Sequence, residues 1–204
     1  MYAPRLPAVL FDLSRLHPRT VASLYSNLVT RPMGAAVRLV LEAQLAEIAG
    51  PCVSVLDFSQ VRVMDYSCAD EIVAKLLVRY RAPDRPADAY FVARGLREHH
   101  VEAVEAVLRH HSLLMVAEYE EGEARLLGTD DPVEHECWAA LSSNERVDLL
   151  EFVASRGYHP EAADGVIRRF VSARVAVLFT EDGLCPVTRI GSINPAPERS
   201  GEDA

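Results

Sequence analysis

The stretch of sequence that decides the fold is residues 53–77, VSVLDFSQVRVMDYSCADEIVAKLL. It begins with an apolar run, Val53 to Phe58, that is typical of a buried strand. After a short polar turn, Ser67 stands before apolar residues at helical spacing, among them Ile72 and Leu76. The stretch therefore predicts a strand, a turn and an amphipathic helix, which together form the repeating unit of an α/β sheet.

The same alternation of strands and helices continues on both sides. Apolar runs rich in β-branched and aromatic residues predict further strands at residues 8–13, 89–93 and 113–118, with an edge strand at 123–127. One predicted helix carries an apolar stripe, made of Val37, Val40, Leu41, Leu45 and Ile48. Its charged residues, Arg38, Glu42 and Glu47, are predicted to face solvent. This pattern predicts an α/β domain with a mixed sheet and helices packed against it.

The pattern changes after Gly128, where residues 129–132 resemble a linker. Ser142 and Glu145 form a capping box, which predicts a helix that ends at Gly157. A second helix is predicted from Pro160 to about Arg174, and a hairpin follows at 175–179 and 184–189. Three helices followed by a hairpin is the order of a winged helix.

We therefore predict two domains and a tail. The mixed-sheet domain covers residues 1–128, and a small winged-helix-like α+β domain covers 132–191. The tail at 192–204 is polar and acidic, and it is predicted to be disordered.

Composition and charge limit the function. The chain has 204 residues and a formal net charge of −9, which argues against nucleic acid as its main partner. Its 4 cysteines stand singly, as in reduced intracellular proteins. Neither a signal peptide nor a membrane-length apolar run is found in the sequence, so we expect a cytoplasmic protein without a membrane partner. No pattern indicates a metal site, a cofactor or a catalytic set, and we do not expect an enzyme.

Two short elements in residues 53–77 resemble STAS domains, the family best known from bacterial anti-sigma factor antagonists. In that family a strand ends in Asp-Leu-Ser, and Asp-Ser-Ser-Gly then opens a helix. Here Asp57, Phe58 and Ser59 match the first element, and residues 65–68, Asp-Tyr-Ser-Cys, occupy the second. Tyr66 replaces a serine of the family pattern and Cys68 replaces its glycine.

The residues that follow are similar to a STAS-like subfamily with Ala-Asp-Glu at this helix start, as at Ala69, Asp70 and Glu71. In that subfamily an arginine and a glycine precede an upstream helix, as Arg31 and Gly34 do here. The resemblance covers roughly residues 8–128.

The resemblance implies a regulatory protein that binds a protein partner, such as a kinase-type anti-sigma factor. It places Ser67 at the position of the family's phosphoacceptor. The expected contact residues surround this serine: Asp65, Tyr66, Cys68, Asp70 and Glu71. A helix N-terminus favours a phosphate, while neighbouring carboxylates repel it, and this opposition could work as a switch. In the alternative interpretation Ser67 is only the N-cap of the helix and pairs with Asp70.

Two other hypotheses start from different residues. The winged-helix-like domain could bind DNA through basic side chains on its last helix and wing, namely Arg168, Arg169, Arg174 and Arg189. A small enzyme could use the Cys68 thiol, because helix N-termini stabilise thiolates. It could instead use a divalent cation on the carboxylates of Asp57, Asp65, Asp70 and Glu71. We rank the enzyme last.

Overall fold

The computed structural model describes residues 27–48, 50–119, 123–143, 149–179 and 183–189. The strand predicted at 8–13 and the tail at 192–204 lie outside these residues. Within them, every helix is too short or too polar to cross a membrane.

The central element is a mixed sheet, as predicted, and four of its strands lie in the described residues. Its strands are β2 (Cys52–Asp57), β4 (Ala89–Arg94), β5 (Met115–Glu118) and β6 (Ala124–Leu127), in that spatial order. The first three are parallel, and β6 pairs antiparallel with β5 at the edge. In β4 the residues from Ala89 to Ala93 are all buried, because helices cover both faces of the sheet. The α/β class is therefore confirmed.

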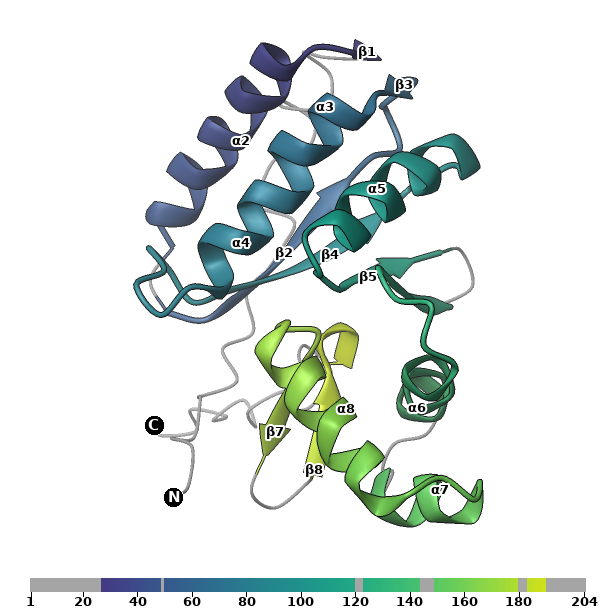
Figure 1. Ribbon diagram of the computed structural model, residues 1–204. Coiled ribbons are helices and arrows are strands. Elements are labelled where there is room, and N and C mark those ends of the chain that lie inside the picture. Colours follow the sequence, from purple (N-terminus) through teal and green to yellow (C-terminus); the bar gives the residue numbers. More distant parts are fainter. Residues whose placement is uncertain (1–26, 49, 120–122, 144–148, 180–182, 190–204) are drawn as a thin grey trace, which may run out of the picture.

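One face of the sheet is covered by three helices that lie side by side (Figure 1). They are α2 (Arg31–Ala46), a continuous helix at residues 66–81, and α5 (Glu98–His110). The 66–81 helix consists of α3 (Tyr66–Ala69), a π-helical turn (Asp70–Ala74) and α4 (Lys75–Arg81). At its start a small parallel sheet joins β1 (Asn27–Leu28) to β3 (Val63–Met64). These two-residue strands are too short to produce a periodic pattern, so the sequence did not predict them.

The C-terminal part covers the other face of the sheet. It contains α6 (Pro132–Ser143), α7 (Leu149–Ser155), α8 (Pro160–Ser172), the hairpin β7 (Ala176–Phe179) and β8 (Gly183–Pro186), and a 3₁₀ turn (Val187–Arg189). The predicted order of helices and hairpin is confirmed, but the predicted helix start at Ser142 is wrong. Ser142 lies in the last turn of α6, where its hydroxyl donates to the carbonyl of Trp138.

The two predicted domains share a hydrophobic core. Trp138 and Phe170 of the C-terminal part belong to the same cluster of buried residues as Val92 and Val116 of the sheet. The structure therefore places the C-terminal part as a third layer on the sheet, and the division into independent domains stays a prediction.

The faces of α2 differ from the prediction. Val37 and Leu45 are buried as expected, but Val40 is exposed. Arg38 and Glu42 form an ion pair, and Arg38 also contacts Glu71 on the neighbouring helix. The predicted apolar stripe is therefore partly wrong. Arg38 faces the 66–81 helix because the carboxylate of Glu71 lies there, and Val40 faces solvent instead.

Candidate functional site

The start of the 66–81 helix is fixed by Asp65. Its backbone is extended (φ −89°, ψ 169°), and its Oδ1 accepts hydrogen bonds from Cys68 N at 2.8 Å and Ser67 Oγ at 2.9 Å. Asp65 is therefore the N-cap, and Ser67 lies at the second helical position. The alternative in which Ser67 caps the helix is wrong. Aspartate and serine cap helices about equally well, so composition alone could not distinguish them.

The cap has a defined charge state. Burial opposes ionisation of the Asp65 carboxyl, but the hydrogen bonds from Cys68 and Ser67 outweigh it and hold its pKa below the ordinary value. Asp65 is therefore ionised at neutral pH, and its negative charge lies 2.9 Å from the Ser67 hydroxyl oxygen.

An apolar surface lies beside this helix start. In the β1–β3 sheet Leu28 and Met64 point into the core, so the residues that alternate with them point outward. Val29 and Val63 are 45% and 47% exposed, and Tyr66, the first residue of α3, is 43% exposed. We call these three residues the helix-start surface. Ser67 is half-buried next to it.

Asp70 and Glu71 lie in the π-helical turn and are buried. Arg31 Nη1 lies 2.6 Å from Asp70 Oδ2 and 3.0 Å from Glu71 Oε1, which ties the start of α2 to this turn. His111 Nε2, at the end of α5, lies 2.8 Å from Asp70 Oδ1. Glu71 also pairs with Arg38 at 3.4 Å and with Lys75. The two carboxylates thus join all three helices of this layer.

These partners keep both carboxylates ionised. Burial opposes their charge, but the hydrogen bonds from Arg31 and His111 to Asp70 hold the pKa of that carboxyl below its usual value. Lys75 and Arg31 do the same for the pKa of Glu71. Asp70 and Glu71 are therefore structural charges, and the expectation that they contact a partner directly needs correction because neither is accessible.

Cys68 is also fully buried. Its Sγ donates to the carbonyl of Thr30 at 2.9 Å, and burial raises the pKa of the thiol. Both observations argue against its expected role in partner contact and against a reactive thiolate at the helix start. Of the residues predicted to contact a partner, only Tyr66 is exposed and Asp65 is half-buried.

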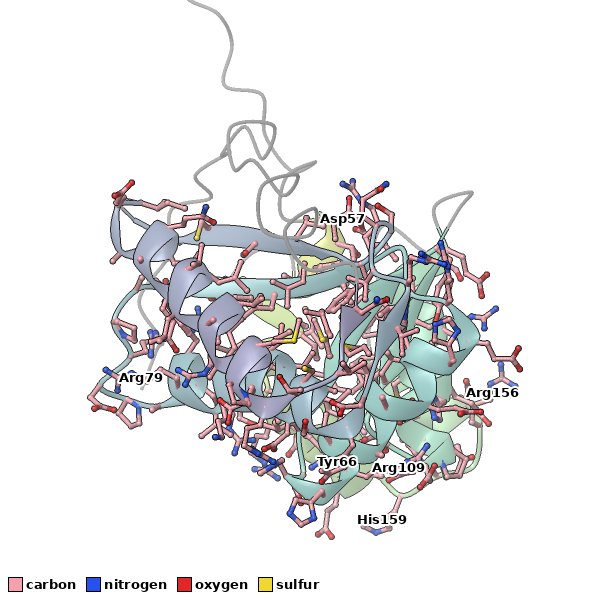
Figure 2. All side chains as sticks on the ribbon, turned by 90° about the horizontal axis from the view of Figure 1, so that it is seen from above. Asp57, Tyr66, Arg79, Arg109, Arg156 and His159 are labelled. Carbon is pink, nitrogen blue, oxygen red and sulfur yellow. The ribbon has the colours of Figure 1, made fainter. Side chains whose placement is uncertain are left out.

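The carboxylates of the cation-site alternative do not come together. Asp57 lies at the end of β2, where it pairs with Arg94 at 2.9 Å. Figure 2 shows Asp57 and Tyr66 on opposite sides of the molecule. In the part of the chain that the structure describes, no group of three or more histidine, cysteine or acidic residues could hold a metal ion.

Two of the four arginines proposed for DNA binding have intramolecular partners. Arg169 Nε lies 2.6 Å from the buried carboxylate of Glu134. Arg174 donates to the carbonyl of Ala89 at 3.1 Å and to Asp88, and its guanidinium stacks on the Tyr90 ring. Arg168 is exposed on α8, and the side chain of Arg189 lies outside the described ones.

Sequence reasoning missed three of the side chains that contact the buried carboxylates: Arg38, Lys75 and His111. Lys75 follows Glu71 by four residues, a helical pairing that the sequence does show. Arg38 and His111 come from other helices, and only the three-dimensional packing brings them close.

Comparison of the chain with models of protein families, with curated proteins and with solved structures finds no match. The proposals below therefore rest on the residues themselves and on the resemblance of residues 57–71.

Proposed function

We propose that the chain is a non-catalytic regulatory protein that binds a protein partner through the helix-start surface of Val29, Val63 and Tyr66. We further propose that phosphorylation of Ser67 controls this binding. The observation that carries the proposal is the position of a half-buried hydroxyl beside three exposed side chains, Val29, Val63 and Tyr66, on a helix whose buried carboxylates Asp70 and Glu71 pair with Arg31.

The surface has the composition of a small protein contact. Exposed aromatic and aliphatic side chains supply most of the binding energy at interfaces, and tyrosine is enriched there. The ion pairs of Arg31 with Asp70 and Glu71 hold the start of α2, which follows Val29, against the helix that follows Tyr66. The surface is therefore rigid before a partner arrives, which lowers the entropic cost of binding.

A phosphoryl group on Ser67 would change this surface electrostatically. It would remove the hydroxyl proton that Ser67 donates to Asp65, and it would add a charge of about −1.5 to −2 beside an ionised carboxylate. The helix N-terminus would attract the same group, so the phosphate and Asp65 would compete for the amides at the helix start. Tyr66 lies between these two residues in the chain, and its position would change with theirs.

The resemblance to STAS domains suggests the partner. Anti-sigma factor antagonists bind anti-sigma factors that are ATPase-type kinases. We propose a partner of this class, with an apolar patch that covers Val63 and Tyr66.

The test is affinity capture from the native host with five forms of the full chain. These are wild type, Val63→Ser, Ser67→Ala, Ser67→Asp and the control Val171→Ser, which changes an exposed valine on α8. We expect one partner to bind wild type, Ser67→Ala and the control, and to be lost with Val63→Ser and Ser67→Asp. Mass spectrometry of the protein from the host should find phosphate on Ser67. A partner that binds all five forms equally, or an unmodified Ser67, would contradict the proposal.

The DNA-binding alternative has less support. Arg169 and Arg174 would have to leave Glu134 and Asp88 to reach phosphates, and the formal net charge of −9 opposes the approach of DNA. A salt-dependent gel shift that Arg168→Ala weakens would favour this alternative.

A further inference from the structure

The first side chain of α2, Arg31, lies over the face of the 66–81 helix that carries Ser67. Ser67 precedes Asp70 and Glu71 by three and four residues, so the three side chains share one helix face. Arg31 Nη1 lies 2.6 Å from Asp70 Oδ2 and 3.0 Å from Glu71 Oε1, so its guanidinium lies between the two carboxylates. Side chains on a helix lean toward its N-terminus. The guanidinium of Arg31 is therefore within one turn of Ser67, about 5 Å along the helix axis.

The backbone of Arg31 is held in this position by the segment that leads into α2, which runs beside the start of the 66–81 helix. The carbonyl of Leu28 accepts a hydrogen bond from Asp65 N at 2.9 Å. Two residues later the carbonyl of Thr30 accepts one from Cys68 Sγ, also at 2.9 Å. Figure 1 shows the starts of α2 and α3 at the same end of the helix layer. These contacts hold Arg31 next to the first turn of the 66–81 helix.

Arg31 has hydrogen-bond donors that its ion pairs do not use. Both pairs involve Nη1, whereas Nη2 and Nε meet no acceptor in the described part of the chain. A guanidinium carries five N–H groups, and 49% of the Arg31 side chain is exposed. Arg31 can therefore bind a further oxyanion without leaving Asp70 and Glu71.

The other side chains that contact these carboxylates are less well placed to reach a group on Ser67. Arg38 is only 20% exposed and also pairs with a second carboxylate on its own helix. Lys75 comes eight residues after Ser67, which is about 12 Å along a helix. His111 approaches from the end of α5 and is positively charged only when protonated. Among these four side chains Arg31 is the best placed.

A phosphoryl group on Ser67 would be driven toward Arg31. Phosphorylation replaces the hydroxyl proton by the γ-phosphoryl group of a nucleoside triphosphate, and the diphosphate and the proton leave. The 2.9 Å hydrogen bond from Ser67 Oγ to Asp65 is lost with that proton, and the ionised Asp65 repels the new charge. Asp70 and Glu71 repel it less, because each is paired with a cation. Since arginine binds phosphate oxygens through two parallel N–H groups, the phosphate moves along the helix face to Arg31.

We propose that Arg31 binds the phosphate of phosphorylated Ser67 and holds it beside the helix-start surface. This inference rests on the proposed function, and it names the side chain of this protein that recognises the modification. Bound to Arg31, the phosphate joins the segment that carries Val29 to the turn that carries Tyr66, and its charge stays next to both. A partner that covers these side chains would have to desolvate that charge, which is costly. Arg31 thereby converts the modification of a half-buried serine into a loss of binding.

The test is a pH titration of the full chain by phosphorus NMR, with phosphoserine introduced in place of Ser67 during translation. The second pKa of a free phosphoserine is about 6. An arginine that binds the dianion lowers this pKa, so we expect it to be about 1 lower with the native Arg31 than in Arg31→Gln. Arg31→Lys keeps the charge without the paired N–H groups and should give an intermediate value. The control Arg38→Gln removes a charge beside the same Glu71 carboxylate and should titrate like the native protein.

The native protein unfolded in urea supplies a second reference, because its phosphoserine no longer meets Arg31. We expect the pKa to be lower in the folded protein than in urea. Equal pKa values for the native protein and a folded Arg31→Gln would overturn the proposal. If Arg31→Gln does not fold, a native pKa at or above the urea value would overturn it as well. Because translation supplies the phosphoserine, the titration tests Arg31 without a host kinase, whereas capture from the host tests the proposed function, so the two failures are distinguishable.

Discussion

One buried carboxylate, Glu71, pairs with Arg31 and Arg38 of α2 and with Lys75 of its own helix. Without this carboxylate Arg31 still pairs with Asp70 and Arg38 still pairs with Glu42, so the loss is that of the charged hydrogen bonds of Glu71, about 1–3 kcal/mol. We therefore expect Glu71→Gln to lower the free energy of unfolding by roughly this amount in urea titrations at neutral pH. The matched control is Glu42→Gln, because Glu42 lies in an i,i+4 pair that is more accessible and should cost less than about 1 kcal/mol.

The effect of Glu71→Gln should also depend on pH. The hydrogen bonds from Lys75 and Arg31 overcome burial and lower the pKa of Glu71 in the folded protein, so the unfolded chain takes up the proton more readily. Its contribution to stability is present above the ordinary carboxyl pKa of 4.5 and is lost as the pH falls toward the folded value. The stability difference between wild type and Glu71→Gln should therefore narrow in acid. A difference that stays constant down to pH ~3 would mean that the charge of Glu71 contributes nothing.

His100 gives a separate pH dependence nearer neutrality. It is fully buried, its Nδ1 accepts from Arg97 N at 3.2 Å, and its Nε2 has no hydrogen-bond partner among the described residues. Burial, with smaller effects from His99 and Arg97, lowers its pKa from the ordinary 6.5. The folded protein therefore holds a neutral imidazole, and stability falls as the pH drops below 6.5 because the unfolded chain binds the proton first.

We expect His100→Gln to reduce this loss of stability between about pH 7.5 and 5.5, where one proton changes the unfolding free energy by at most about 1.4 kcal/mol per pH unit. Urea titrations at both pH values measure it. The control His110→Gln changes an exposed histidine at the end of α5 and should keep the wild-type slope. An identical slope in all three proteins would show that His100 is not the titrating group.

At the scale of single residues the sequence located the helix start but not the roles within it. The polar run Asp65 to Ser67 predicted a helix N-terminus, and the structure has one. Which side chain caps it depends on the backbone conformation of Asp65, which composition does not determine. The burial of Asp70 and Glu71 could not be predicted from the sequence either. Charged residues usually face solvent, and they are buried only where partners from elsewhere in the fold pair with them.

At the scale of elements, the contact between α2 and α3 requires a glycine. A Cβ at Gly34 would lie 2.9 Å from the Cβ of Glu71 and 3.0 Å from the Cα of Cys68. We expect Gly34→Ala to destabilise the protein by about 1–3 kcal/mol, because the overpacking outweighs the better helix propensity of alanine. Urea unfolding and the far-UV spectrum check this.

Gly165 provides the matched control. It also lies inside a helix, α8, but a Cβ there would have nothing within 4 Å. Gly165→Ala should therefore stabilise the protein by about 0.5–1 kcal/mol through helix propensity alone. Opposite signs for the two substitutions are the expected result. A stabilising Gly34→Ala would mean that α2 can move away from α3 at little cost.

The helix α2 also shows where periodicity fails as a guide. Its apolar residues occupy most of its circumference, so the sequence allowed more than one choice of buried face. Val37 and Leu45 fitted the prediction, whereas Val40 did not. The buried face of α2 includes Arg38 because its guanidinium pairs with the buried carboxylate of Glu71.

At the scale of the whole molecule, the strands of the central sheet were predictable from the sequence, whereas the packing of helices on its two faces was not. The runs at 53–58, 89–93 and 113–118 are apolar and rich in β-branched or aromatic residues, and each forms a strand of one sheet. That β4 is buried on both faces was visible in its continuous apolar sequence, Ala89 to Ala93. The second face of the sheet is covered by the C-terminal part, which the sequence analysis assigned to a separate domain. The change of pattern after Gly128 does not reveal what the following segment packs against.

The shared core predicts that the described layers unfold together. Trp138, the only tryptophan, lies in the cluster that joins the C-terminal part to the sheet, whereas Leu108 of α5 lies in the cluster on the opposite face. Leu108→Ala should cost about 2–5 kcal/mol. If the layers are one cooperative unit, this substitution shifts the urea midpoint of Trp138 fluorescence as far as the midpoint of far-UV circular dichroism. If residues 132–191 form an independent domain, the fluorescence midpoint stays at its wild-type value while the circular dichroism transition moves. Leu141→Ala, in α6 and in the same buried cluster as Trp138, is the positive control, since it should shift the fluorescence midpoint in either case.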